Sequence, residues 1–192
     1  MELSPIASKF IVHWGEMGTL WGVNRTVSQI HALLFFHGRP LHAEDISAAL
    51  AAARSNVSNS LKELLNWNLI RVTHVLGDRR DYYETSLDVW ELFRTVVRER
   101  KEREFDPTVR MLNDLVKQPG FEAESPDAQD RVRETLRLMQ ATGLWTDEML
   151  RLSPATLEKV LRMGASVQKF VRGEEAVSTS KPMDPAQSLP PF

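Results

Sequence analysis

The chain has 192 residues, of which 42% are hydrophobic and 26% are charged, as is ordinary for a globular protein. Its 24 Lys and Arg against 26 Asp and Glu give a net charge of −2, so any basic surface must be local. The sequence contains no cysteine, which excludes disulfides, thiolate metal sites and a cysteine nucleophile. No segment approaches the roughly 20 apolar residues that span a bilayer, and the N-terminus lacks the pattern of a signal peptide. We therefore expect a cytoplasmic protein that has no membrane partner.

Apolar residues at helical spacing predict that the chain begins with several helices. The first covers residues 4–18 and is expected to close at Gly18, and the second ends near Gly38. A short helix over 43–51 is followed by another over 54–67.

The helix over 54–67 has a polar face opposite its apolar stripe. Asn68 follows it and can take the left-handed conformation that ends a helix. Two strands, at 69–75 and 80–86, are joined by a Gly-Asp turn and predict a β-hairpin. The polar face carries short hydrogen-bonding side chains and two cations: Arg54, Ser55, Asn56, Ser58, Asn59 and Lys62.

A helix, a turn, a helix with a polar face and a β-hairpin, in this order, are typical of a winged helix-turn-helix, whose second helix enters the DNA major groove. The hairpin tip carries Arg79 and Arg80, which are suited to the negative potential of the minor groove and its phosphates. From Arg54 to Arg80 there are five basic residues against two acidic ones. The sequence thus predicts a mainly α (α+β) fold that binds DNA. The alternative is a winged-helix protein-interaction module whose basic wing meets an acidic partner.

A helix is expected directly after the hairpin, from about residue 88, and Asp106 is expected to cap a new start. Three further helices follow at about 107–117, 126–142 and 154–172, each with a proline in its first position. The remaining residues are rich in Pro and Ser and lack periodicity. We expect four regions: an N-terminal dimerisation helix (1–21), a winged helix-turn-helix DNA-binding domain (22–87), a helical dimerisation and effector region (88–172) and a disordered tail (173–192).

The segments WGVNRTVSQIHALLF, PLHAEDISAALAAARSNVSNSLKELLNWNLIRV and GDRRDYYE resemble the GbsR subgroup of the MarR-type winged-helix transcriptional regulators. The resemblance covers about residues 10–95. It implies a homodimeric regulator, expected to be a repressor, that binds double-stranded operator DNA through the recognition helix and the wing. Two positions depart from the family: Ala53 stands where a Ser or Asp often caps the recognition helix, and Asn68 replaces the usual Gly.

Trp14, Trp21 and Trp90 are candidates for an effector pocket, because tryptophan faces attract quaternary ammonium groups. The resembling subgroup is linked to choline and glycine betaine metabolism, which implies a small-molecule effector of this kind. The alternative is that these rings belong to the dimer or domain core. The five histidines lack metal-ligand spacing and no catalytic motif is present, so we expect no metal, no cofactor and no enzymatic activity.

Overall fold

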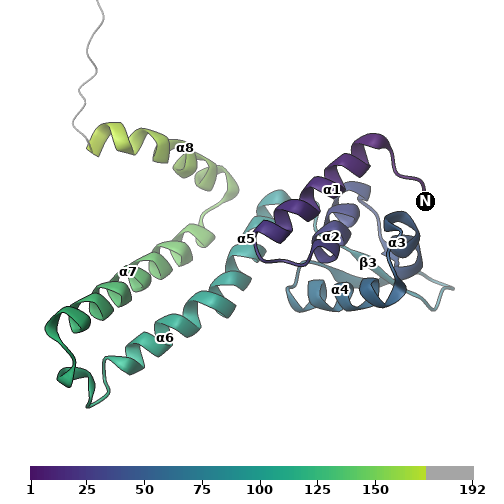
Figure 1. Cartoon of the computed structure of the whole chain (residues 1–192). Coiled ribbons are helices and arrows are strands. Elements are labelled where there is room, and N and C mark those ends of the chain that lie inside the picture. Colours follow the sequence, from purple (N-terminus) through teal and green to yellow (C-terminus); the bar gives the residue numbers. More distant parts are fainter. Residues whose placement is uncertain (172–192) are drawn as a thin grey trace, which may run out of the picture. The chain divides into compact units, whose positions relative to one another are not determined.

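The computed structural model describes residues 1–171, which form helices and one small sheet (Figure 1). The helical elements are α1 Pro5–Leu20, α2 Arg25–His37, α3 Ala43–Leu50, α4 Arg54–Asn66, α5 Val89–Arg100, the π-helix η1 Lys101–Phe105, α6 Asp106–Leu115, the 3₁₀ turn η2 Phe121–Ala123, α7 Pro126–Arg151 and α8 Pro154–Val171. The strands are β1 Leu41–His42, β2 Arg71–His74 and β3 Asp81–Glu84. They form an antiparallel sheet in the order β1-β3-β2. The mainly helical winged fold expected from the sequence is confirmed.

The chain divides into two compact units, at residues 1–150 and 151–192. The first holds the winged domain and the helices α5 to α7, and the second includes α8. None of the helices within residues 1–171 combines the length and the apolarity that a membrane span requires. The tail expected from residue 173 lies outside the described residues.

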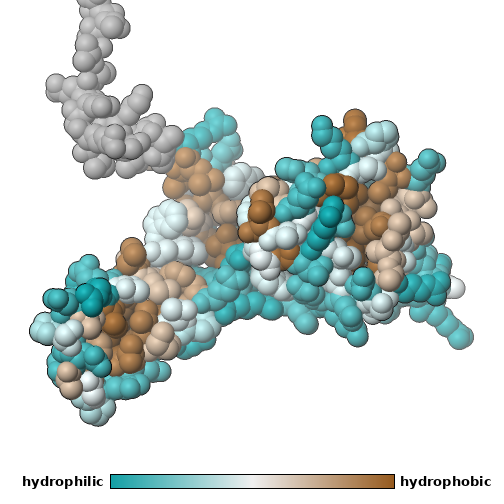
Figure 2. All heavy atoms as spheres, in the orientation of Figure 1, coloured by the Kyte–Doolittle hydropathy of each residue, from teal (hydrophilic) through white to brown (hydrophobic). Residues whose placement is uncertain are grey.

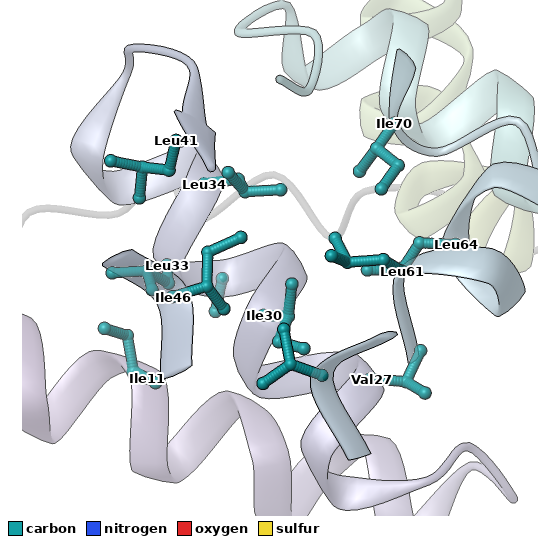
Figure 3. Close-up of a cluster of buried hydrophobic side chains, with 12 residues drawn as sticks. Ile11, Val27, Ile30, Leu33, Leu34, Leu41, Ile46, Leu61, Leu64 and Ile70 are labelled. Atoms are coloured by element: carbon teal, nitrogen blue, oxygen red, sulfur yellow. The ribbon is translucent and has the colours of Figure 1, made fainter. Parts of the chain in front are cut away.

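The winged domain is built around the apolar faces of α2 and α4 (Figure 3). Ile30 and Leu33 of α2 belong to this core, and both are almost fully buried. Burying such side chains is the main stabilising contribution in a domain of this size. The core consists of Ile11, Val27, Ile30, Ala32, Leu33, Leu34, Leu41, Ile46, Val57, Leu61, Leu64 and Ile70. This core joins α1 to α4 and the start of β2 in one packing unit.

Local capping explains where α2 begins and ends. The Asn24 side chain accepts a hydrogen bond from the Thr26 amide at 2.8 Å, and Gly38 ends the helix at φ 69°. Asn68 has φ 52° after α4, as its position in the sequence predicts. Residues 41–42 form an additional short strand that pairs with β3, which sequence periodicity does not reveal because it is only two residues long.

Gly18 does not end the first helix, contrary to the sequence prediction. Helix α1 continues to Leu20, and Gly18 is buried where α1 and α2 cross. A Cβ added to Gly18 would lie only 1.9 Å from Ser28 Oγ. The glycine is therefore required for the close approach of two helices, a role that local sequence rules do not distinguish from helix termination.

The expected new helix start at Asp106-Pro107 is also wrong, because α5, η1 and α6 follow one another without a break. Pro107 has no amide hydrogen, and its ring would crowd the carbonyl of Arg103 in a regular α-helix. The chain instead widens into the π-helix η1, in which the Asp106 amide donates to the Lys101 carbonyl. Helix α7 packs against this element, and a Cβ on Gly143 would lie 3.3 Å from Phe105 Cε1.

His31 links α2 to the base of the wing. Thr85 Oγ1 donates to the Leu69 carbonyl at 2.8 Å, so the 3.1 Å contact between His31 Nε2 and Thr85 Oγ1 requires the imidazole to donate. Burial lowers the pKa of His31 from 6.5 to about 4. The neutral imidazole is therefore the form that this position accommodates.

We predict that Gly18→Ala lowers the free energy of unfolding by about 2 kcal/mol, because Ser28 and the crossing helix must move. Chemical denaturation measures the effect. Gly120→Ala is the control, since a Cβ there meets nothing within 4 Å. Equal stability of the two variants would contradict the close helix crossing.

We predict that the chain loses stability as the pH falls from about 6.5 to about 4, with a total change on the order of 3 kcal/mol from His31. Over this range the unfolded state binds a proton that the folded state does not, so lower pH favours unfolding. Denaturation across this pH range should show a shallower dependence for His31→Gln. The exposed His13→Gln variant is the control and should keep the parent slope.

Candidate nucleic-acid interface

Helix α4 separates buried and exposed residues on opposite faces. Val57, Leu61 and Leu64 enter the core, which fixes the rotation of the helix about its axis. The six residues of α4 that are predicted to contact DNA are all exposed: Arg54, Ser55, Asn56, Ser58, Asn59 and Lys62. Because residues three and four apart share a helix face, Ser55, Asn59 and Lys62 form one continuous polar row. Helix α4 is therefore a short element with a fixed, accessible polar surface.

The first turn of α4 lacks the usual side-chain cap. Ala53 occupies the N-cap position and makes no capping hydrogen bond, as its side chain predicts. Unpaired amides remain at this end of the helix, where they and the helix dipole favour an anion. Arg54 lies beside them, and its Nη2 is 3.3 Å from Glu44 Oε1 of α3. Both side chains are largely exposed, at 81% and 59%, so a phosphate group can compete with Glu44 for Arg54.

The wing is the hairpin of β2 and β3, in which Val72 faces Tyr83 and Thr73 faces Tyr82. Gly77 has φ 83°, a conformation that L side chains rarely adopt, and the Asp78 amide donates to the Val75 carbonyl to close the turn. The tip thus has a defined backbone.

The two wing arginines differ in their surroundings. Arg80 Nε lies 2.9 Å from Asp78 Oδ2, and its Nη2 is 3.0 Å from the Tyr82 hydroxyl. Its Nη1 approaches His42 Nε2 of β1 at 2.8 Å. Arg79 is exposed and makes no hydrogen bond or ion pair with any residue of the described chain. Arg80 therefore braces the wing, whereas Arg79 is available to a ligand.

The bracing contacts also affect protonation. Hydrogen bonding from Arg80 holds the pKa of Asp78 well below its usual range, and the same pair raises the pKa of Arg80. The Tyr82 hydroxyl donates to Asp78 Oδ2 at 2.9 Å, which raises the pKa of the phenol. The His42 ring meets the Tyr82 ring edge to face, with centroids 5.5 Å apart. The contributions of His42 and Tyr82 were missed by sequence reasoning, because only the β1–β3 pairing brings these two residues together.

The three tryptophans of the expected effector pocket occupy separate places. Trp14 stacks on Phe10 with ring centroids 5.4 Å apart, and Trp21 caps the end of α1. Trp90 lies near the start of α5 and meets Phe93 edge to face. None of the three is among the residues that line the two cavities described next. A pocket that contains these rings stays a prediction.

Cavities lie at the base of the wing and beside the π-helix. The first, of about 330 Å³, lies between the end of α2, the base of the wing and α5; its walls include Arg39, Glu84 and Glu91. The second, of about 280 Å³, lies between η1 and α7, beside Phe105 and Met139. Within residues 1–171 no group of three or more His, Cys, Asp or Glu side chains is arranged to hold a metal ion.

Comparison with known proteins agrees with this geometry. Residues 21–81 match the MarR family, over the part of the chain that forms the winged domain. The chain is similar to the HTH-type transcriptional repressor OpcR of Bacillus subtilis (strain 168), with 21% identity over 69% of this chain and 74% of that protein. It is also similar to the putative HTH-type transcriptional regulator YvaV of the same organism, with 23% identity over 77% of this chain and 86% of that protein.

A crystal structure described as a transcriptional regulator shares the fold. It covers 76% of this chain and 96% of its own, with a TM-score of 0.64 and 20% identity. The family match and both relatives concern transcriptional regulators and not enzymes. Residues 21–81, which match the MarR family, form a winged helix-turn-helix domain, and the chain is a DNA-binding transcriptional regulator.

Proposed function

We propose that the chain binds operator DNA as a homodimer and represses transcription, with α4 in the major groove and the wing over the adjacent minor groove. The observation that carries this proposal is the exposed polar row of α4 beside a braced wing that presents Arg79. Asn and Ser side chains have the donors and acceptors that read base edges, and Arg54 and Lys62 can neutralise phosphates. Repression is inferred from the name of OpcR, a transcriptional repressor.

A dimeric state is supported by apolar side chains that are exposed outside the winged core (Figure 2). Ile6 and Leu20 of α1 and Leu144 and Trp145 of α7 are each more than half exposed. Exposed apolar side chains mark a protein interface where they gather into one patch. We assign dimerisation to residues 1–21 and to the helical region from residue 88, because two recognition helices read two half-sites with much higher affinity than one.

We further infer that the chain belongs to the GbsR subgroup and responds to a small-molecule effector. The inference rests on the resemblance of the segments WGVNRTVSQIHALLF and GDRRDYYE to that subgroup. An effector acts by favouring one of two arrangements of the recognition helices, so that operator affinity changes with its concentration. Trp14, Trp21 and Trp90 are the residues to substitute first in a search for its site.

Selection of bound fragments from genomic DNA, followed by a salt titration, tests the proposed function. The logarithm of the association constant should fall linearly with the logarithm of the salt concentration, because phosphate neutralisation releases condensed cations. We predict that Arg79→Ala reduces this slope by about one unit. Arg80→Ala should change the slope less, because Asp78 already pairs with the Arg80 guanidinium.

A chain that binds no genomic fragment at low salt would instead fit the protein-interaction module with an acidic partner. Equal slopes for the parent and Arg79→Ala would show that the wing tip does not contact phosphate.

We predict that Glu44→Gln strengthens operator binding by up to about fivefold, because Arg54 no longer has to leave an ion pair to reach phosphate. Fluorescence anisotropy with labelled operator measures the change. Glu102→Gln, an equal change of charge at an exposed residue outside the winged domain, serves as the control. Weaker binding by Glu44→Gln than by this control would contradict the competition.

A further inference from the structure

The C-terminal end of α4 is tied to the helix α5 by a buried carboxylate. Glu99 is only 7% exposed. Its Oε1 accepts a hydrogen bond from Asn68 Nδ2 at 2.5 Å, and its Oε2 accepts one from Arg103 Nε at 3.0 Å. Both carboxylate oxygens are thus engaged, one by the residue that ends α4 and the other by η1.

Arg103 adds two contacts to the same end of α4. Its Nη2 donates to the Asn66 carbonyl, and its guanidinium lies 5.0 Å from the centroid of the Trp67 ring. Arg100 lies over the same ring at 5.9 Å and donates to the Trp21 carbonyl at 2.9 Å. The last turn of α4 is therefore held through its backbone, an aromatic ring and a side-chain amide.

Asn68 departs from the glycine that the resembling family usually has at this position. Glycine adopts the left-handed conformation, here φ 52°, more readily than asparagine does. Only asparagine, however, supplies the amide that reaches Glu99. Asn68 therefore adopts the left-handed conformation less readily than glycine would, but it gains a hydrogen bond to Glu99 of α5.

The opposite side of η1 is attached to α7. Lys101 Nζ lies 3.0 Å from Asp106 Oδ1 and 3.3 Å from Asp147 Oδ1. These hydrogen bonds raise the pKa of Lys101, so the ammonium form is held. The π-helix is consequently fixed to α7 by Lys101 and to α4 by Glu99 and Arg103.

We propose that Glu99 and Arg103 are positioning residues that fix the orientation of the recognition helix α4 relative to α5. By fixing this orientation they also determine the distance between the two recognition helices of the dimer. The assignment rests on the proposed function, since that separation acts on operator half-sites. Only the carboxylate of this pair is buried, since the Arg103 side chain is 42% exposed. A buried carboxylate needs hydrogen-bond donors, and Asn68 and Arg103 supply them from fixed directions. The structure places such bonds where α4 meets the helical region.

The distance between α4 and α6 within one chain, measured without DNA, tests whether Glu99 and Asn68 fix the orientation of α4. Spin labels at Ser58→Cys and Arg110→Cys report on α4 and α6, and the absence of native cysteine makes the labelling specific. Dilution with unlabelled chain leaves only pairs within one chain. We expect a single narrow distance distribution in the parent and a broader one in Asn68→Gly and Glu99→Gln.

Asn68→Gly is the decisive variant because it keeps the left-handed turn and removes only the amide. The control is Glu102→Gln, which neutralises an exposed carboxylate on the same π-helix. Distributions in Asn68→Gly and Glu99→Gln as narrow as in this control would overturn the positioning role.

Operators with altered half-site spacing test the consequence for specificity. The parent should prefer one spacing over those longer or shorter by one or two base pairs. In unlabelled Asn68→Gly and Glu99→Gln this preference should fall about fivefold or more, whereas affinity for an isolated half-site should not change. If the variants lost affinity equally for every spacing and for the isolated half-site, the role of these residues in spacing would be overturned. Failure of the parent to bind any operator would refute both the proposed function and the role in spacing. The spin-label distances are measured without DNA, so they test the contact between α4 and α5 independently of that outcome.

Discussion

The burial of Val57, Leu61 and Leu64 against α2 is the constraint on which the rest of the molecule depends. An α-helix has one rotation about its axis, so the three apolar side chains that enter the core also determine which side chains remain outside. The polar row of α4 is the consequence, and its accuracy depends on the packing around Ile30 and Leu33. Stability and recognition therefore share the same residues, and damage to this core would alter the surface before the domain unfolds.

The wing has a different basis, because few of its side chains reach the core. Its order comes from polar contacts around Arg80, in which one guanidinium joins Asp78 and Tyr82 of the hairpin to His42 of β1. Exposed ion pairs contribute little stability individually, but a network that shares one guanidinium limits the conformations of the tip. As a result, Arg80 stabilises the hairpin tip, whereas the adjacent Arg79 remains exposed to solvent.

Sequence periodicity located the helices of the winged domain and every candidate residue on α4, because core burial imposes a simple repeat on short amphipathic helices. It failed at Gly18 and Pro107, where the local residue type suggests a boundary and tertiary packing overrides it. The contacts of Glu44, Glu99 and His42 were not predictable, since each joins residues brought together by folding. Local signals thus establish the elements, whereas the connections between elements require the structure.

The π-helix η1 has a consequence for how proteins of this architecture can diverge. A π turn contains one residue more than the α turn it replaces. Because the wider turn absorbs this extra residue, a related chain without Pro107 that lacks one residue between positions 101 and 105 would form a regular helix, and its later residues would keep nearly the same orientation. A change of one residue in length at this position therefore preserves both the face that α6 directs toward a partner and the DNA-reading surface.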